Sequence, residues 1–289
     1  MSNVFTILFL VTYFSAKSFG VPVENGQNVG SVEIMGKTAL VSGQKEFPFV
    51  AHITIETTKY GKRNTAWCTG VIIGTNAVLT AAHCLDGKVK PKVTVHVGIV
   101  DVKWEKNAGQ KVVSTKHTSH KQYRPQCAVG KRCCYAANDL AVLWLDTELN
   151  FGAYVEAAPL NKVEEKPVDK EGWILGWGLT EEDVTPTRLQ KGLVKATSTR
   201  VCERHNKRLY ITQNVICLTG VKKGTKSGSG DSGGPFVIDG VVYGISSFAA
   251  HNTCQTLDVY THFIKCPVVN EKKGIIAFYK KILNQRNSF

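Results

Sequence analysis

The chain has 289 residues, and 36 Lys and Arg against 23 Asp and Glu give it a formal net charge of +13. Hydrophobic residues make up 43% of the chain and charged residues only 20%, a balance that excludes an intrinsically disordered protein. Nine cysteines cannot all pair within one chain, so an oxidising compartment would leave one thiol over.

The first predicted element is a secretory signal peptide, residues 1–20. Its apolar run, Val4 to Phe14, is too short to cross a bilayer and is followed by small and polar residues as far as Gly20. No later run is long enough to span a membrane, so we expect a secreted, extracellular protein whose cysteines are oxidised. The polar, glycine-rich residues 21–37 are predicted to be a leader or propeptide.

The rest of the chain is predicted to be mostly β-strand. Short runs rich in Val, Ile, Thr and aromatic residues alternate with Gly, Asn, Asp and Pro, which favours an all-β barrel or sandwich. The clearest runs are Phe49 to Thr57, Cys68 to Ile73, Val93 to Val97, Leu140 to Leu145, Trp173 to Leu175 and Val241 to Ser247. A helix is expected only at the end, over residues 270–285, where Ile275, Tyr279 and Ile282 share a face.

Three short strings carry the candidate chemistry. They are Leu-Thr-Ala-Ala-His-Cys around His83, Asn-Asp-Leu-Ala-Val-Leu around Asp139, and Gly-Asp-Ser-Gly-Gly-Pro around Ser232. A serine hydroxyl is a weak nucleophile, so it needs an imidazole base and a carboxylate that orients the imidazole. Those three residues supply these roles, and the N–H groups of Gly230 and Ser232 are the expected donors to an oxyanion.

These strings, with Gly-Trp-Gly around Trp177 and Val-Tyr-Thr around Tyr260, resemble the trypsin/chymotrypsin family of serine endopeptidases. The resemblance runs from about Thr38 to the C-terminus. It implies a protease domain at residues 38–289 with two six-stranded antiparallel β-barrels, about 38–155 and 156–269, and the active site in the cleft between them. It also implies hydrolysis of protein and peptide substrates through an acyl-enzyme, without a cofactor or a metal. The alternative is a weak or inactive homologue that acts as a polyanion-binding or protein-binding regulator.

The resemblance also implies two disulfides, Cys68–Cys84 and Cys202–Cys217. The other cysteines are Cys127, Cys133, Cys134, Cys254 and Cys266. We expect Cys266 to bridge to one of the first three, which crowd into a loop longer than is usual for the family. The alternative is a cysteine-rich metal site with His117 or His120. Calcium is not expected, because Ile99 and Gly109 stand where some relatives place carboxylates.

The expected specificity pocket departs from the tryptic pattern. Lys226 stands where trypsin-like enzymes place a carboxylate, and a cation there repels a basic substrate side chain. Asp258 and Ala249 replace glycines of the pocket wall. Lys226 either pairs with Asp258 across the pocket floor or reaches a substrate carboxylate; the third possibility is that both are solvated loop charges.

Activation is the second departure. In the family a new apolar N-terminus pairs with the aspartate before the nucleophile, here Asp231. A cut after Lys37 would leave Thr38 first, whereas a cut after Ala39 would leave Leu40 first.

The positive charge concentrates in two segments: the cysteine-rich loop, with Lys121, Arg124, Lys131 and Arg132, and the terminal region, with Lys265, Lys272, Lys273, Lys280, Lys281 and Arg286. If the two lie together, they form a basic surface suited to a sulfated polysaccharide, or else a solvated basic face. No motif or aromatic platform for nucleic acid accompanies these charges.

Overall fold

The structure, a computed structural model, describes residues 39–88, 90–103, 109–127, 134–163, 165–179, 185–205, 214–222, 225–249 and 258–263. The predicted signal peptide, the leader, the terminal helix, and Cys133, Cys254 and Cys266 lie outside these residues. So does most of the predicted basic surface. The candidate catalytic residues all lie inside them.

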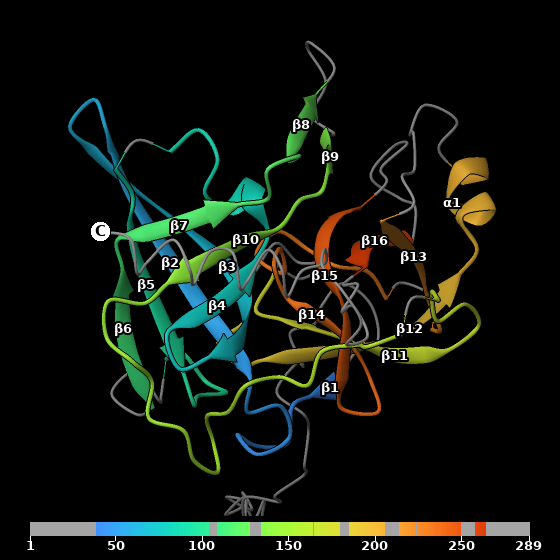
Figure 1. Cartoon of the computed structure of the whole chain (residues 1–289), viewed down its shortest axis with the longest axis horizontal. Coiled ribbons are helices and arrows are strands. Elements are labelled where there is room, and N and C mark those ends of the chain that lie inside the picture. Colours follow the sequence, from blue (N-terminus) through green and yellow to red (C-terminus); the bar gives the residue numbers. More distant parts are fainter. Residues whose placement is uncertain are drawn as a thin grey trace, which may run out of the picture. The chain divides into compact units, whose positions relative to one another are not determined.

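The first half of the chain forms one antiparallel sheet of order β6-β5-β2-β3-β4-β10-β7 (Figure 1). Its strands are β2 (Val50–Lys59), β3 (Lys62–Gly74), β4 (Ala77–Thr80), β5 (Lys92–Val97), β6 (Gln110–Ser114), β7 (Lys116–Ser119) and β10 (Ala141–Trp144). Only Thr115 separates β6 from β7, which form the two ends of this order. The sheet therefore closes on itself as a six-stranded barrel, in which β6 and β7 together occupy the position of one strand.

The second half forms a sheet of order β1-β12-β11-β14-β15-β16-β13, and an additional pairing of β12 with β13 closes six of its strands into a ring. The strands are β1 (Ala39–Leu40), β11 (Glu171–Gly176), β12 (Gln190–Thr197), β13 (Val215–Gly220), β14 (Pro235–Ile238), β15 (Val241–Ala249) and β16 (Asp258–Phe263). The predicted fold of two six-stranded antiparallel barrels is confirmed. Strand β1 is an addition at the edge of the second barrel.

Alternating side chains explain why these segments form barrel walls. Every second residue of β12 is buried and the residues between are half-buried, as expected of a strand with one face on a core. Strands β4 and β10 are buried throughout, because other parts of the chain cover both of their faces. All six runs predicted from the sequence coincide with strands.

Trp177 joins the two barrels beside the candidate site. Its indole N–H donates to the carbonyl of Val100 at 3.3 Å, and the ring of His52 meets it edge-on at 5.2 Å between centroids. Burial, and secondarily the nearby His96, lowers the pKa of His52 to about 4. His52 is therefore neutral at physiological pH and acts as a packing residue.

Three shorter elements complete the described chain: a 3₁₀ helix (Ala82–Cys84), the hairpin of β8 (Arg124–Cys127) and β9 (Cys134–Ala137), and the helix α1 (Thr199–His205). The disulfides Cys68–Cys84 and Cys202–Cys217 are both present. In the hairpin, the backbone of Cys127 lies opposite that of Cys134. The pairing of the remaining cysteines stays a prediction.

Candidate active site

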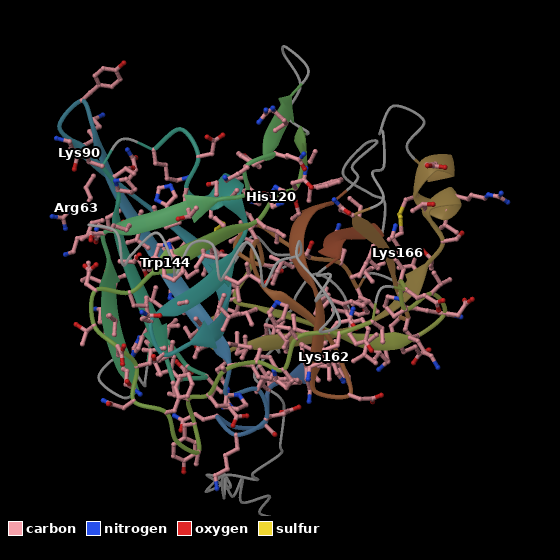
Figure 2. The ribbon with its side chains drawn as sticks, in the orientation of Figure 1. Arg63, Lys90, His120, Trp144, Lys162 and Lys166 are labelled. Carbon is pink, nitrogen blue, oxygen red and sulfur yellow. A yellow bond between two sulfur atoms is a disulfide. The ribbon has the colours of Figure 1, made fainter. Side chains whose placement is uncertain are left out.

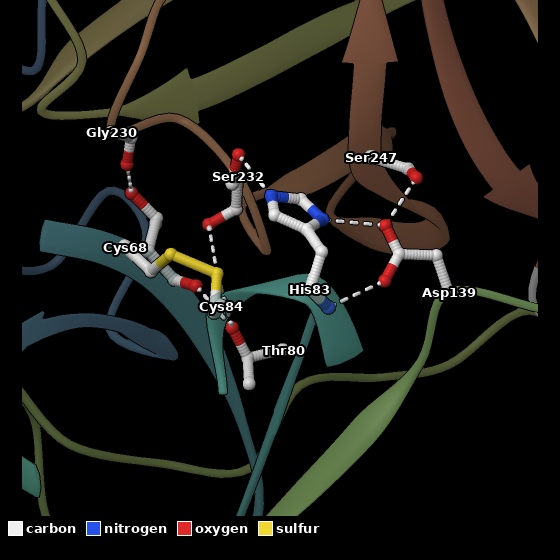
Figure 3. The surroundings of a disulfide bond; sticks show 9 residues. Cys68, Thr80, His83, Cys84, Asp139, Gly230, Ser232 and Ser247 are labelled. Carbon is white, nitrogen blue, oxygen red and sulfur yellow. Dashed lines mark hydrogen bonds and ion pairs between the residues drawn. A yellow bond between two sulfur atoms is a disulfide. The ribbon is translucent and has the colours of Figure 1, made fainter. Parts of the chain in front are cut away.

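His83 is held at the end of the first barrel by the short 3₁₀ helix that follows β4. Its backbone N–H donates to one carboxylate oxygen of Asp139 at 2.8 Å, and its Nδ1 lies 2.6 Å from the other (Figure 3). Since an ionised carboxylate only accepts hydrogen bonds, Nδ1 carries the ring proton. The second nitrogen of the neutral ring, Nε2, is thereby left as an acceptor.

Ser232 lies in the loop that precedes β14, and its Oγ lies 2.8 Å from Nε2 of His83. The tautomer fixed by Asp139 makes Oγ the donor in this contact. The structure therefore joins three residues from two barrels in one chain of hydrogen bonds, from the Ser232 hydroxyl through His83 to Asp139. This is the arrangement that a hydroxyl needs in order to lose its proton as it attacks.

Asp139 is fully buried, and its charge is held by hydrogen bonds. The hydroxyl of Ser247, on β15, donates to its Oδ2 at 2.5 Å. Burial alone would raise the pKa of Asp139, but the hydrogen bonds from His83 and Ser247 outweigh it and leave the pKa below its usual value. Sequence reasoning missed Ser247, because no local string marks a serine within a strand as a partner of a distant carboxylate.

The loop around Ser232 is pinned to the first barrel through Thr69. The N–H of Thr69 donates to the carbonyl of Ser232 at 2.8 Å, and its hydroxyl donates to the carbonyl of Gly230 at 3.0 Å. Gly230 has a φ of +110°, which is costly for any residue with a Cβ. The N–H groups of Gly230 and Ser232 make no hydrogen bond to another part of the chain that the structure describes. They are thus available to an outside acceptor.

Asp231, the residue between those two donors, is buried below the loop. Its carboxylate accepts the N–H groups of Gly228 at 2.7 Å and Gly178 at 2.8 Å. No cationic side chain of the described residues pairs with it. Burial raises the pKa of Asp231 to about 6, against the opposing effect of the two backbone hydrogen bonds. A neighbouring ammonium group would stabilise the ionised form of this buried carboxylate.

The pocket residues are described only in part. Lys226 is half-buried in the loop before Gly228. Ala249 and Asp258 belong to the paired strands β15 and β16, and Asp258 lies opposite Thr219 of β13. The side chains of Ala249 and Asp258 lie outside the described residues, so the predicted Lys226–Asp258 pair stays a prediction.

Within the described ranges, no group of three or more His, Cys, Asp and Glu residues is arranged to hold a metal ion. His120 accepts the N–H of Gln122 at 3.1 Å, and the cysteine side chains of the alternative metal site lie outside these ranges. None of the helices in the same ranges is long and apolar enough to cross a membrane.

Comparison with known proteins extends the similarity over most of the chain. Residues 39–271 match the family model described as Trypsin. Mouse mast cell protease 8 is 27% identical over 242 residues, 83% of this chain and 87% of that protein. Human kallikrein-8 is 31% identical over 215 residues, 73% of this chain and 77% of that protein.

Solved structures of such proteins share the fold. Mouse neuropsin, a serine protease expressed in the limbic system of the brain, is 26% identical with a TM-score of 0.63, over 78% of this chain and 94% of that one. An inactivated protease paralogue of the scabies mite is 19% identical with a TM-score of 0.66, over 86% of this chain and 96% of that one. The second likeness is one of fold alone.

Proposed function

The chain belongs to the trypsin family of serine proteases, and from that membership we propose that it is a secreted serine endopeptidase. The observation that carries this proposal is the hydrogen-bond chain from Ser232 through His83 to the buried Asp139. A fluorophosphonate probe, which forms a stable adduct only with an activated serine, tests it directly. Labelling of the processed protein at Ser232 is the expected result.

In the proposed reaction, Ser232 Oγ attacks the carbonyl carbon of the scissile bond while Nε2 of His83 takes the hydroxyl proton. The resulting imidazolium is stabilised by Asp139. The carbonyl oxygen becomes an oxyanion that accepts the N–H groups of Gly230 and Ser232. His83 then donates its proton to the departing amine, the C–N bond breaks, and an acyl-enzyme remains on Ser232.

A water molecule completes the cycle. His83 takes a proton from the water as its oxygen attacks the acyl carbon, the ester bond to Ser232 breaks, and His83 returns the proton to Oγ. Every proton moved in both halves passes through Nε2 of His83. The ring orientation set by Asp139 therefore governs both steps.

The proposed specificity is non-tryptic, since Lys226 stands where a basic substrate side chain would have to be neutralised. In a peptide library, we expect sequences with Lys or Arg before the cut to be cleaved at least about tenfold more slowly than those with small or acidic residues. The variant Lys226→Ala should narrow that difference, because it removes the repelling charge. A strong preference for Lys or Arg in the unaltered protein would overturn the proposed specificity.

Activation requires an amine that reaches Asp231, and strand β1 limits where that amine comes from. Leu40 pairs with Gln190, which pairs with Gly176, the residue against which the Asp231 carboxylate packs. Neighbouring strands lie about 4.8 Å apart, so the amine must cross roughly 10 Å from β1, or about three extended residues. A chain that begins at Thr38 has one residue in front of Ala39, and a chain that begins at Leu40 loses β1.

The geometry of β1 argues against both of the cuts expected from the sequence. We propose instead a cut between Glu33 and Ile34, which leaves five residues ahead of Ala39 and an apolar first residue. The new ammonium group would pair with Asp231. These residues precede the described part of the chain, so the proposal rests on the reach from β1 and on the sequence.

Two precursors with an engineered protease site test this assignment. We expect cleavage that exposes Ile34 to raise peptidase activity about a hundredfold or more, whereas cleavage that exposes Thr38 leaves the activity of the precursor unchanged. Equal activation of both would contradict the assignment.

The pH dependence of stability gives an independent measure of whether a new ammonium group pairs with Asp231. With Asp231 unpaired, its folded pKa of about 6 exceeds the ordinary value of 3.8, so the folded state binds the proton more tightly. The stability contributed by this group is complete below pH 3.8 and is lost as pH rises towards 6. Pairing with an ammonium lowers the folded pKa and removes that loss. Unfolding curves between pH 4 and 6.5 should therefore differ in slope between precursor and cleaved protein.

The second candidate is an inactive homologue that acts as a binding protein. The scabies mite paralogue is described as inactivated, and a shared fold alone does not distinguish the two classes. The three residues of the hydrogen-bond chain favour the enzyme. Binding of a sulfated polysaccharide by the cysteine-rich loop and the terminal region stays a separate proposal, and retention on heparin at physiological salt is its test.

A further inference from the structure

The donor N–H of Gly230 owes its direction to hydrogen bonds on both sides of this residue. The peptide before it is trans, so its N–H points opposite to the carbonyl of Ser229. That carbonyl accepts the N–H of Leu179, which follows β11 of the second barrel, at 2.8 Å. The Gly230 N–H is thereby turned away from Leu179.

The peptide after Gly230 is held at both of its ends. Its N–H, which belongs to Asp231, donates to the carbonyl of Gly228 at 3.1 Å within the same loop. Its carbonyl, which belongs to Gly230, accepts the hydroxyl of Thr69 at 3.0 Å (Figure 3). Of these three hydrogen bonds to the peptides that flank Gly230, the last is the one that a side chain supplies, and it comes from the first barrel.

Thr69 is itself fixed in place. It is fully buried on β3, its N–H donates to the carbonyl of Ser232 at 2.8 Å, and its carbonyl accepts the hydroxyl of Thr80 at 2.9 Å. Thr80 is the last residue of β4, the strand that leads to His83. Thr69 therefore connects the loop of Ser232 to the strand that positions His83.

Gly230 needs such contacts because glycine has almost no conformational preference of its own. At its φ of +110° a side chain would be strained, and a Cβ would approach Cα of Gly178 to 3.0 Å. A loop that leaves this conformation can rotate the peptide between Ser229 and Gly230. That rotation would turn the Ser229 carbonyl, an acceptor, towards the place where the oxyanion forms, and the donor would be lost.

We propose that Thr69 is a positioning residue for the oxyanion site: its hydroxyl holds the Gly230 carbonyl and so keeps the Gly230 N–H directed at the reacting oxygen. The inference rests on the proposed function, because it takes that oxygen to be the one that becomes charged. Thr69 acts through Gly230 in this role. The contact differs from the pairing of Asp231 with a new N-terminus, since it depends on neither a charge nor a cut.

Thr69→Val tests the proposal in the processed protein, because valine keeps the shape of threonine and the backbone hydrogen bonds of Thr69 but has no hydroxyl. We expect kcat for a library-selected peptide to fall about five- to tenfold and KM to stay within about twofold. A peptide aldehyde of the same sequence, whose adduct with Ser232 places an oxygen at the Gly230 N–H, should bind about five- to tenfold more weakly. Thr69→Ser keeps the hydroxyl and should stay within about twofold of the original in all three constants.

Thr118→Val is the matched control, since it removes another threonine hydroxyl that forms a hydrogen bond in the first barrel. This hydroxyl, on β7, accepts the indole N–H of Trp144, which is labelled in Figure 2, at 3.0 Å. Both kcat and the affinity for the aldehyde should stay within about twofold, whatever stability the barrel loses. Thr69→Ala is a second variant without the hydroxyl, and it excludes crowding by the valine methyl group as the cause.

Hydrogen exchange of the Asp231 N–H reports on the same loop without any need for peptidase activity. Exchange should be about fivefold faster in Thr69→Val and Thr69→Ala than in the original protein and in Thr69→Ser. Kinetic constants and exchange that change less than about twofold in both variants without the hydroxyl overturn the proposal. So does a Thr69→Ser variant as impaired as Thr69→Ala, because packing of the methyl group would then be the cause. A wild-type protein that takes up no fluorophosphonate contradicts the peptidase activity alone, and hydrogen exchange then decides the role of Thr69.

Discussion

Replacement of Ser232 by Ala is expected to lower kcat for any cleaved peptide by about 10⁵- to 10⁶-fold and to leave KM within a few-fold. The hydroxyl oxygen is the atom that forms the bond to the acyl group, and no other described hydroxyl lies within hydrogen-bonding distance of Nε2 of His83. The strands that flank the site are untouched, so substrate binding persists. Steady-state kinetics on a library-selected peptide measures both constants.

Ser229→Ala is the matched control for that variant. It removes the same hydroxyl three positions earlier in the same loop, where Ser229 is exposed and contributes its backbone carbonyl to Leu179. Its kcat should stay within about twofold of the original. If Ser232→Ala retained more than about one per cent of the activity, Ser232 would not be the nucleophile.

Asp139→Asn is expected to lower kcat by about 10⁴-fold while the fold is kept. The amide is similar in size to the carboxylate, but its NH₂ group donates where the carboxylate accepts. The proton of His83 is then driven from Nδ1 to Nε2, which can no longer accept the hydroxyl proton of Ser232. The buried negative charge that stabilises the imidazolium is lost as well.

Ser247→Ala offers a graded comparison at the same carboxylate. It deletes one of the hydrogen bonds that hold the pKa of Asp139 low, yet leaves the carboxylate and its two contacts with His83. We expect a loss of about tenfold in kcat, with unchanged labelling stoichiometry. An Asp139→Asn variant as active as Ser247→Ala would contradict the role given to Asp139 in setting the tautomer.

The sequence identified the residues of the site because each sits in a local string that chemistry constrains. Gly233 and Gly234 must lack a Cβ for the loop of Ser232 to approach the carbonyls of Thr69 and Leu175, and these glycines are visible in the sequence. Ser247 carries no such mark, since its partnership with Asp139 arises only when β15 of the second barrel meets the first. Helix α1 was missed for a related reason: it is short and is anchored by the Cys202–Cys217 disulfide rather than by an amphipathic pattern.

The N-terminal region is a second case in which the folded chain changes the interpretation of the sequence. The string from Thr38 to Gly43 looks like a weakened version of the family's first residues when it is viewed alone. In the fold, Ala39 and Leu40 are already strand β1, in register with Lys191 and Gln190. The contact between Glu46 and Lys191, with Ser42 donating to the same carboxylate, fixes the chain just after that strand. The distance that a new N-terminus must cover to reach Asp231 follows from this register, and the sequence alone does not give it.

Mass spectrometry of the protein cut before Ile34, after treatment with a fluorophosphonate, tests the central claim most directly. One adduct per molecule is expected, located on Ser232, and the uncut precursor should form it about a hundredfold more slowly or not at all. A folded protein that begins at Ile34 and forms no adduct would contradict it, and would leave the two-barrel scaffold as a binding protein.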